Sequence, residues 1–333
     1  MTMMAKKLTT DSIIIPVSVI TTCYGRNRHL YHLLSSLAQG SVRPSEVIVV
    51  NDDADPERLA QYPLNIIQIA TSDYATLNSN SELSVSSKPN NTGFDIGRNR
   101  NLGAAKASHD ALIFLDVDCI VAPTFIEQLH TKLQAHPKAL LMGQPRYLTR
   151  PLTDNEGIQL QQGQLPRTNL DNLSVYNPYR FNFNSSECNT KATAIEQTQD
   201  YGAFWSLCFA ISKAQFEQID GFDTHYVGYG AEDTDFAFTA RKLGIDFYLT
   251  NDVIYHQQHS VYRPPLNHLS SIVINANRFY NKWQHWPMGG WLEAFAEMGL
   301  IDWHAKQRNP IILISKPSTA DIEKAHYPNA PYV

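Results

Sequence analysis

The chain of 333 residues is 43% hydrophobic and 18% charged, which is typical of a soluble globular protein with a sizeable core. Its formal net charge of −5 and its lack of basic runs argue against nucleic acid as a partner, because phosphate backbones attract basic surfaces. No apolar run approaches the roughly 20 residues that span a bilayer, so at most a peripheral membrane association is expected.

The cysteines, at positions 23, 119, 188 and 208, have neither metal-binding nor redox spacing. Reduced thiols of this kind are typical of the cytoplasm. The segment 1–12 is polar, and the apolar run 13–20 is too short for the hydrophobic part of a signal peptide. We therefore predict a cytoplasmic protein.

The first part of the chain alternates apolar runs with helical patterns. Strands are predicted over 13–20, 47–50, 64–69 and 111–115, and helices over 30–37, 97–107 and 125–133. Strand, helix and strand at this rhythm indicate βαβ units. The sequence therefore predicts an α/β fold with a mostly parallel, Rossmann-like sheet flanked by helices.

Two carboxylates, Asp116 and Asp118, follow the apolar run 111–115. Five consecutive apolar residues are typical of a strand buried on both faces. Side chains alternate along a strand, so the two acids point the same way if the strand continues through them. Ligands of open α/β sheets bind beyond the carboxyl ends of strands, where paired carboxylates suit a divalent cation. An isolated pair is equally consistent with a solvated strand end.

The later part of the chain begins with a polar segment, 144–200, which predicts a long loop that acts as a lid or binding arm, or a surface insertion. Its aromatic residues are expected to border the acceptor side of a site; they are Tyr176, Tyr179, Phe181 and Phe183. Further elements are predicted over 204–211 (strand), 213–218 (helix), 232–243 (helix), 245–249 (strand) and 266–279 (helix).

Six short motifs occur in a characteristic order. They are PVSVITTCYGR at 16–26, VVNDD at 49–53, RNLGAA at 100–105, FLDVD at 114–118, GFD at 221–223 and GYGAEDTD at 228–235. In this order they resemble the motifs of inverting, family 2-like GT-A glycosyltransferases, and the last two resemble the β-1,4-galactosyltransferase and chondroitin-polymerase type. The resemblance implies a GT-A fold that moves a sugar from a nucleotide donor, usually UDP, to a hydroxyl of a glycan or glycolipid acceptor, as in polysaccharide biosynthesis.

The resemblance also divides the chain. Residues 13–122 would form the nucleotide-sugar-binding half and 123–260 the acceptor and catalytic half of one GT-A domain, with 144–200 as an insertion. Residues 261–333 would form a C-terminal helical extension and tail. One set of motifs implies one transfer site.

For the metal, the resemblance implies ligation by Asp118 and by an imidazole from His256, with Asp116 at the ribose or reaching the metal through water. His259 is the rival ligand, and a surface histidine is the plain alternative. Carboxylate plus imidazole suits Mn²⁺ better than Mg²⁺. The cation would offset negative charge on the leaving diphosphate.

For the nucleotide, the resemblance implies contacts from residues after the first strand, namely Thr21, Tyr24 and Arg26. Asp52 would accept a hydrogen bond from the uracil N3–H. The family usually has the sequence Asp-Asp-Gly at this point, where this chain has Asn51, Asp52 and Asp53. That departure leaves Asp53 as an alternative. Arg100 would face the nucleotide or diphosphate, since a guanidinium suits phosphate. The alternatives without a binding role are an ordinary polar turn after the second strand and an exposed arginine on a helix at position 100.

Glu232, Asp233 and Asp235 lie at the start of a predicted helix. The helix dipole favours acids there, but three acids in four residues exceed what capping requires. An inverting transfer needs a base for the acceptor hydroxyl, and the resemblance assigns it to Asp233, with Glu232 binding sugar hydroxyls. Tyr229 replaces the family's usual Trp and Ala231 its usual Gly, which leaves the identities of donor and acceptor open.

Two other functions fit parts of the pattern. A sugar-1-phosphate nucleotidyltransferase would need a glycine-rich basic loop after the first strand, and 21–27 has one glycine. A non-catalytic sugar-binding protein on a GT-A fold would not need to retain the acids and histidine named above.

Overall fold

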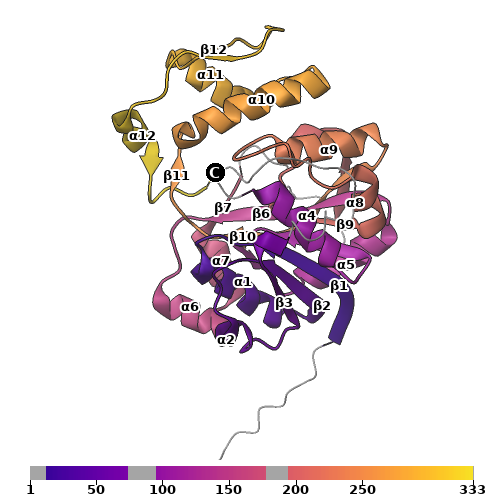
Figure 1. Cartoon of the computed structure of the whole chain (residues 1–333). Helices are drawn as coiled ribbons and strands as arrows, with labels where there is room; N and C mark the ends of the chain where they lie inside the picture. Colours follow the sequence, from indigo (N-terminus) through magenta and orange to yellow (C-terminus); the bar gives the residue numbers. More distant parts are fainter. Residues whose placement is uncertain (1–12, 74–94, 178–193, 333) are drawn as a thin grey trace, which may run out of the picture.

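The computed structural model describes residues 13–73, 95–177 and 194–332. A central sheet carries helices on both faces, and a smaller C-terminal module of helices and short strands lies beside it (Figure 1). The predicted α/β class is confirmed. Within the described residues, no helix has both the length and the apolar character needed to cross a membrane.

The main strands of the sheet lie in the order β3, β2, β1, β4, β9, β6, β10, β5. Their bounds are β1 (Ile13–Thr22), β2 (Val42–Val50), β3 (Ile66–Ile69), β4 (Ala111–Leu115), β5 (Cys119–Val121), β6 (Ala139–Leu148), β9 (Cys208–Ser212) and β10 (Asp246–His256). Pairing is parallel from β3 to β4 and between β6 and β10, whereas β9 is antiparallel to both of its neighbours. Six of these strands therefore end at the same edge of the sheet.

One face of the sheet is covered by α1 (Asn27–Ala38) and α5 (Phe125–Ala135). The leucines of α1 recur at helical spacing and are buried, as are the apolar residues of α5; they are Leu30, Leu33, Leu34, Leu37, Phe125, Ile126, Leu129 and Leu133. They pack against side chains that alternate along β1 and β4, such as Val19 and Ile113. These local patterns predicted both helices correctly.

The opposite face is covered by α4 (Ile96–Lys106), α8 (Lys213–Ile219) and α9 (Glu232–Lys242). Its core is aromatic: the ring of Phe114 stacks on that of Phe209 at 4.4 Å between centroids. A Cβ on Gly103 would lie 2.5 Å from Ile20 Cγ2, so only glycine lets α4 approach β1 this closely.

The prediction of a long loop over 144–200 is wrong for the described part of that segment. It contains the end of β6, α6 (Asp154–Gln161), α7 (Arg167–Leu173), β7 (Ser174–Tyr176) and β8 (Ile195–Thr198). These helices bury only a few widely spaced leucines, so the apolar period is weak. The capping box formed by Thr153 and Glu156 is the sequence feature that could have predicted the start of α6.

Tyr176 lies in β7, whereas Tyr179, Phe181 and Phe183 lie outside the described residues. The expectation that these aromatics border the acceptor stays a prediction. Of the cysteines, 23, 119 and 208 are free and buried, and Cys188 lies outside the described residues.

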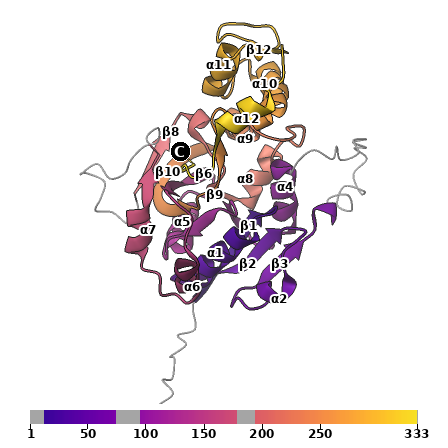
Figure 2. The ribbon, with the colours of Figure 1, turned by 90° about the vertical axis from the view of Figure 1, so that its left-hand side faces the viewer.

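The C-terminal module has its own core around Ile272, Leu292 and Phe295. Its elements are β11 (Val261–Tyr262), α10 (Leu269–Trp283), α11 (Gly289–Glu297), β12 (Ile301–Asp302), β13 (Ile312–Leu313), α12 (Thr319–Ala325) and β14 (His326–Tyr327). The division of the chain at residue 261 stays a prediction, and the segment after it contains the helices α10, α11 and α12. After α12 the chain returns toward the sheet, and its end lies near β6 and β10 in both views (Figures 1 and 2).

The remaining short elements connect these layers. They are α2 (Pro56–Leu59), η1 (Thr71–Asp73), η3 (Tyr201–Ala203) and η4 (Leu266–His268). The strand predicted over 204–211 starts only at Cys208. The chain before it forms η3, and the hydroxyl of Tyr201 in η3 donates a hydrogen bond to the Ile245 carbonyl at 2.6 Å.

Candidate active site

The two acids after β4 do not continue the strand. β4 ends at Leu115 and the chain turns over 116–118, because β5 runs back in the opposite direction along β10. The Cys119 N–H donates to the Asp116 carbonyl at 3.0 Å and closes this turn. The premise that Asp116 and Asp118 alternate along one strand is therefore wrong, and the two side chains have different partners.

Asp118 meets two histidines because of strand pairing. In the antiparallel pair β5–β10, Cys119 lies opposite His256, and the Gln257 N–H donates to the Asp118 carbonyl at 2.7 Å. The potential ligand atoms of Asp118, His256 and His259 all lie within 4.8 Å of one another. Asp118 and His256 are 6% and 4% exposed. The structure thus places both candidate histidines at Asp118.

The two imidazoles have the protonation that metal ligands need. His259 Nδ1 donates to the Ser260 carbonyl at 2.9 Å, and its Nε2 lies 3.6 Å from Asp118 Oδ2. His256 Nδ1 is buried without a hydrogen-bond partner among the described residues. Burial lowers the pKa of His256 to about 3 and also lowers the pKa of His259. Both rings are therefore neutral near pH 7 and can offer a lone pair.

Asp118 also accepts hydrogen bonds from the segment after β1. Arg26 Nη1 contacts Oδ2 and His29 Nδ1 contacts Oδ1. Burial alone would raise the pKa of Asp118, but the His29 hydrogen bond and the Arg26 charge hold it well below its usual range. Asp118 is thus an anion at neutral pH. His29 was missed by the sequence analysis, since no motif or spacing marks it.

Asp116 pairs with an arginine instead of joining the histidines. Its Oδ1 accepts from Arg100 Nη2 at 2.7 Å. Burial raises the pKa of Asp116 and the Arg100 charge opposes that shift. Arg100 is 3% exposed, and its Nη1 has no hydrogen-bond partner among the described residues. A buried guanidinium with a spare donor suits an anionic group.

Asp235, the third acid of the α9 cluster, has a structural role. It is 2% exposed and accepts from Trp283 Nε1 at 2.7 Å, from Lys282 Nζ at 2.8 Å and from the Tyr226 hydroxyl at 3.1 Å. Lys282 and Trp283 belong to α10, so Asp235 ties α9 to the C-terminal module.

Glu232 and Asp233 keep partial exposure at the start of α9. The pKa of Glu232 is raised to about 7, mainly by poor solvation of the carboxylate and to a lesser extent by the negative charge of Asp233. The charge of Asp116 adds to this shift and that of Arg100 opposes it. These charges act on Glu232 because α9 begins beside the Asp116–Arg100 pair. Asp233 Oδ1 accepts from the Thr234 N–H at 2.7 Å.

The residues predicted to hold the nucleotide lie around the ends of β1 and β2. Thr21 is 1% exposed and its hydroxyl has no hydrogen-bond partner among the described residues, whereas Tyr24 is 71% exposed. Both oxygens of Asp52 accept from Thr71, at 2.7 Å from its N–H and 2.6 Å from its hydroxyl. Asn51 is buried and its amide donates to the Cys23 carbonyl at 3.2 Å, which joins the two loops.

Tyr332 enters the site from the end of the described chain. Its hydroxyl lies 3.0 Å from that of Tyr229, and its ring centroid lies 4.7 Å from that of His256. Tyr229 in turn stacks on His268 at 4.6 Å. Sequence analysis missed Tyr332, because its distance along the chain from every motif leaves no local signal.

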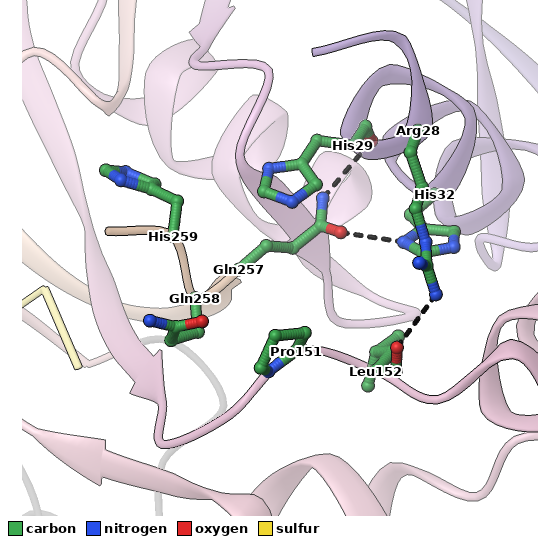
Figure 3. Close-up of a pocket in the computed structure, with 8 residues that line it drawn as sticks. All are labelled: Arg28, His29, His32, Pro151, Leu152, Gln257, Gln258 and His259. Carbon is green, nitrogen blue, oxygen red and sulfur yellow. Dashed lines mark hydrogen bonds between the residues drawn. The ribbon is translucent and has the colours of Figure 1, made fainter. Parts of the chain in front are cut away.

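A cavity of about 200 Å³ lies between α1 and the segment that follows β10 (Figure 3). It is lined by Arg28, His29, His32, Pro151, Leu152, Gln257, Gln258 and His259. Gln257 bridges two of its walls: Nε2 donates to the His29 carbonyl at 3.1 Å and Oε1 accepts from His32 at 2.7 Å. These bonds fix the chain just after His256.

The sequence profile of glycosyl transferase family 2 matches residues 18–214, more than half of the chain. The chain belongs to glycosyl transferase family 2. A second profile, described as the N-terminal domain of galactosyltransferase, matches residues 187–262. Both halves of the resemblance seen in the motifs are therefore confirmed, and the fold is that of a GT-A glycosyltransferase.

Two named relatives are similar over most of the chain. Validoxylamine A glucosyltransferase of Streptomyces hygroscopicus subsp. limoneus is 22% identical over 294 residues, covering 80% of this chain and 56% of that protein. N-acetylglucosaminyl-diphospho-decaprenol L-rhamnosyltransferase of Mycobacterium tuberculosis is 24% identical, covering 83% of this chain and 90% of that protein. The chain thus spans little more than half of the first relative.

Solved structures with a similar fold include two glycosyltransferases. S. aureus TarS 1–349 in complex with UDP-GlcNAc has a TM-score of 0.48 and 15% identity, covering 80% of this chain and 67% of that chain. GalNAc-T7 with UDP, GalNAc and Mn²⁺ has a TM-score of 0.46 and 14% identity, covering 72% of this chain and 43% of that chain.

Proposed function

We propose that this family 2 chain is a metal-dependent inverting glycosyltransferase that moves a sugar from a UDP-sugar to a hydroxyl of a glycan or lipid-linked acceptor. The observation that carries the proposal is the group formed by Asp118, His256 and His259, which lies at the strand ends beside the Asp116–Arg100 pair. The chain thus combines a cation site, an anion-binding arginine and the acids of α9 in one region.

The proposed cation ligands are Asp118, His256 and His259. The bond from His259 Nδ1 to the Ser260 carbonyl leaves Nε2 of that ring able to bind a metal, and the buried, neutral His256 ring offers a ligand atom within 4.8 Å of it. One carboxylate and two imidazoles suit a borderline ion such as Mn²⁺ better than Mg²⁺. When bound, the cation would offset the charge that gathers on the leaving diphosphate.

Asp116 is proposed to act on the donor rather than as a direct metal ligand. Its pairing with Arg100 orients both groups, so that the carboxylate suits a ribose hydroxyl and the spare guanidinium donor suits a phosphate oxygen. Arg26 contacts Asp118 through its Nη1. When the donor binds, the Arg26 guanidinium is proposed to move part of its contact from the Asp118 carboxylate to the diphosphate.

The uracil is proposed to lie over the ends of β1 and β2, near Thr21 and Tyr24, with Asp52 accepting its N3–H. Each carboxylate oxygen has two lone pairs, so Asp52 can keep its bonds to Thr71 and accept one more. Asp53 remains the alternative acceptor on the same loop.

Asp233 is proposed as the general base, with Glu232 holding sugar hydroxyls. A carboxyl group whose pKa is near 7 is protonated part of the time, so Glu232 can both donate to and accept from hydroxyls. The buried anchors of Asp235 fix the start of α9 and thereby orient both residues.

The test is an assay of UDP release with a panel of UDP-hexoses and UDP-N-acetylhexosamines, with simple glycosides or lipid-linked sugars as acceptors. The proposal predicts Mn²⁺-dependent UDP release that the correct acceptor accelerates. A nucleotidyltransferase would instead release pyrophosphate from UTP and a sugar-1-phosphate. A sugar-binding protein would bind without turnover, and either result would overturn the proposal.

A further inference from the structure

The last described residues, 326–332, form a tail that docks on the segment 258–263, which includes His259. β14 pairs with β11, and Gln258 Nε2 donates to the carbonyls of Pro328 at 2.9 Å and Ala330 at 3.0 Å. Arg263 Nη2 donates to the Pro331 carbonyl at 2.6 Å. The stretch that carries His259 therefore also holds the tail.

Tyr332 spans the distance between the metal site and the acids of α9. Its ring centroid lies 4.7 Å from that of His256 and 5.2 Å from that of His259. Its hydroxyl lies 3.0 Å from that of Tyr229, which precedes α9 by a few residues. Burial raises the pKa of Tyr332, and the nearby charges of Asp116, Asp118 and Asp233 add to that shift. Tyr332 thus lies where the proposed metal and catalytic groups converge.

His256 lacks the polar support that a ligand histidine usually has. Such a ring commonly donates its second N–H to a carbonyl or carboxylate, which fixes its orientation. His259 has this support from Ser260, but His256 Nδ1 has no hydrogen-bond partner among the described residues. Its ring packs instead between Tyr147, at 5.5 Å between centroids, and Tyr332.

We propose that Tyr332 is a positioning residue of the metal site, whose ring packs on His256 so that the imidazole stays aimed at Asp118. Docking of the tail and binding of the cation then strengthen each other, because a coupling between two events acts equally in both directions. This inference rests on the metal role proposed for Asp118 and His256.

The test compares Mn²⁺ binding by calorimetry in the full wild-type chain and in three variants. Tyr332→Ala removes the ring and should weaken Mn²⁺ binding by about tenfold or more, the effect typical of losing support for a ligand. Tyr332→Phe keeps the ring and should bind Mn²⁺ nearly as the wild type does. The control Tyr327→Ala changes a tyrosine of the same tail that is 47% exposed, and it should bind Mn²⁺ as the wild type does.

Hydrogen exchange of the tail gives a second readout that needs no activity. Mn²⁺ should slow exchange of the amides of 326–332 in the wild type, and Asp118→Ala should abolish this protection. Thermal unfolding of each variant verifies that it is folded.

The outcomes separate this inference from the proposed function. Wild-type protein that does not bind Mn²⁺ would contradict the metal site and the inference together. If the wild type binds Mn²⁺ and Tyr332→Ala binds it equally well, the inference alone is overturned. A loss in Tyr332→Phe as large as that in Tyr332→Ala would also overturn it, because ring packing would then not be what supports His256.

Discussion

Asp118 and His256, which come from different halves of the chain, are held side by side by the antiparallel pairing of β5 with β10. Cys119 lies opposite His256, and a backbone hydrogen bond of 2.7 Å joins Gln257 to Asp118. Because main-chain atoms set this geometry, either side chain can be replaced without removing the frame that positions the other.

The two histidines are expected to share metal binding. His256→Ala and His259→Ala should each weaken Mn²⁺ binding, and the double variant should abolish it, because the ligand atoms of both rings lie close to Asp118. Calorimetric titration of Mn²⁺ into each variant tests this, with His304→Ala as a control at an exposed histidine outside the ligand group. Should one of the two single variants bind Mn²⁺ as the wild type does, that histidine is not a ligand.

Asp233→Asn should separate catalysis from binding. The amide keeps the shape of the side chain but cannot take the acceptor proton, so transfer should fall by about 10² or more. Calorimetry should show that UDP and Mn²⁺ still bind. Glu232→Gln should mainly raise the KM for a sugar substrate. If Asp233→Asn transfers normally while Glu232→Gln is inactive, their roles must be exchanged.

Asp235→Ala should act on stability. The substitution leaves the Trp283 and Tyr226 donors without their acceptor and removes the ion pair with Lys282. The free energy of unfolding should fall by at least about 2 kcal/mol, since each buried hydrogen bond to a charge contributes on the order of 1.5–3 kcal/mol. Urea unfolding measures this fall. A variant as stable as the wild type would show that Asp235 does not anchor α10.

Glu232 should make stability depend on pH in a defined direction. Its pKa in the folded state, raised from 4.5 to about 7, exceeds its value in the unfolded chain, so the folded state binds the proton more tightly. This contribution is fully present below about pH 4.5 and is lost as the pH rises through about 7.

Urea unfolding of the wild type and Glu232→Gln from pH 4.5 to 8 tests this sign. The wild type should lose stability relative to the variant as the pH rises. A difference that stays constant over this range would contradict the raised pKa.

The sequence predicted most of the sheet and its helices, because patterns such as the leucines of α1 are local and their burial follows the helical period. The sequence also singled out the acids at the start of α9 and the pair Asp116 and Asp118. The helices α6 and α7 were missed, since each buries few apolar residues and only the cap at Thr153 marks a start.

The missed parts of the site depend on tertiary structure. The separation of Asp116 from Asp118 follows from the reversal of the chain into β5, which pairs with a strand far along the sequence. His29 contacts Asp118, and Tyr332 packs on His256. The residues that flank His29 and Tyr332 in the sequence form no motif from which these contacts could be predicted.

Asp118 is proposed to hold a cation that binds the diphosphate of a UDP donor. The most direct test of this proposal is calorimetric titration of UDP into folded wild type and Asp118→Ala, each with and without Mn²⁺. Mn²⁺ should strengthen UDP binding by the wild type and leave UDP binding by Asp118→Ala unchanged, while circular dichroism shows the same fold for both proteins. An equal gain from Mn²⁺ in both proteins would contradict the proposal.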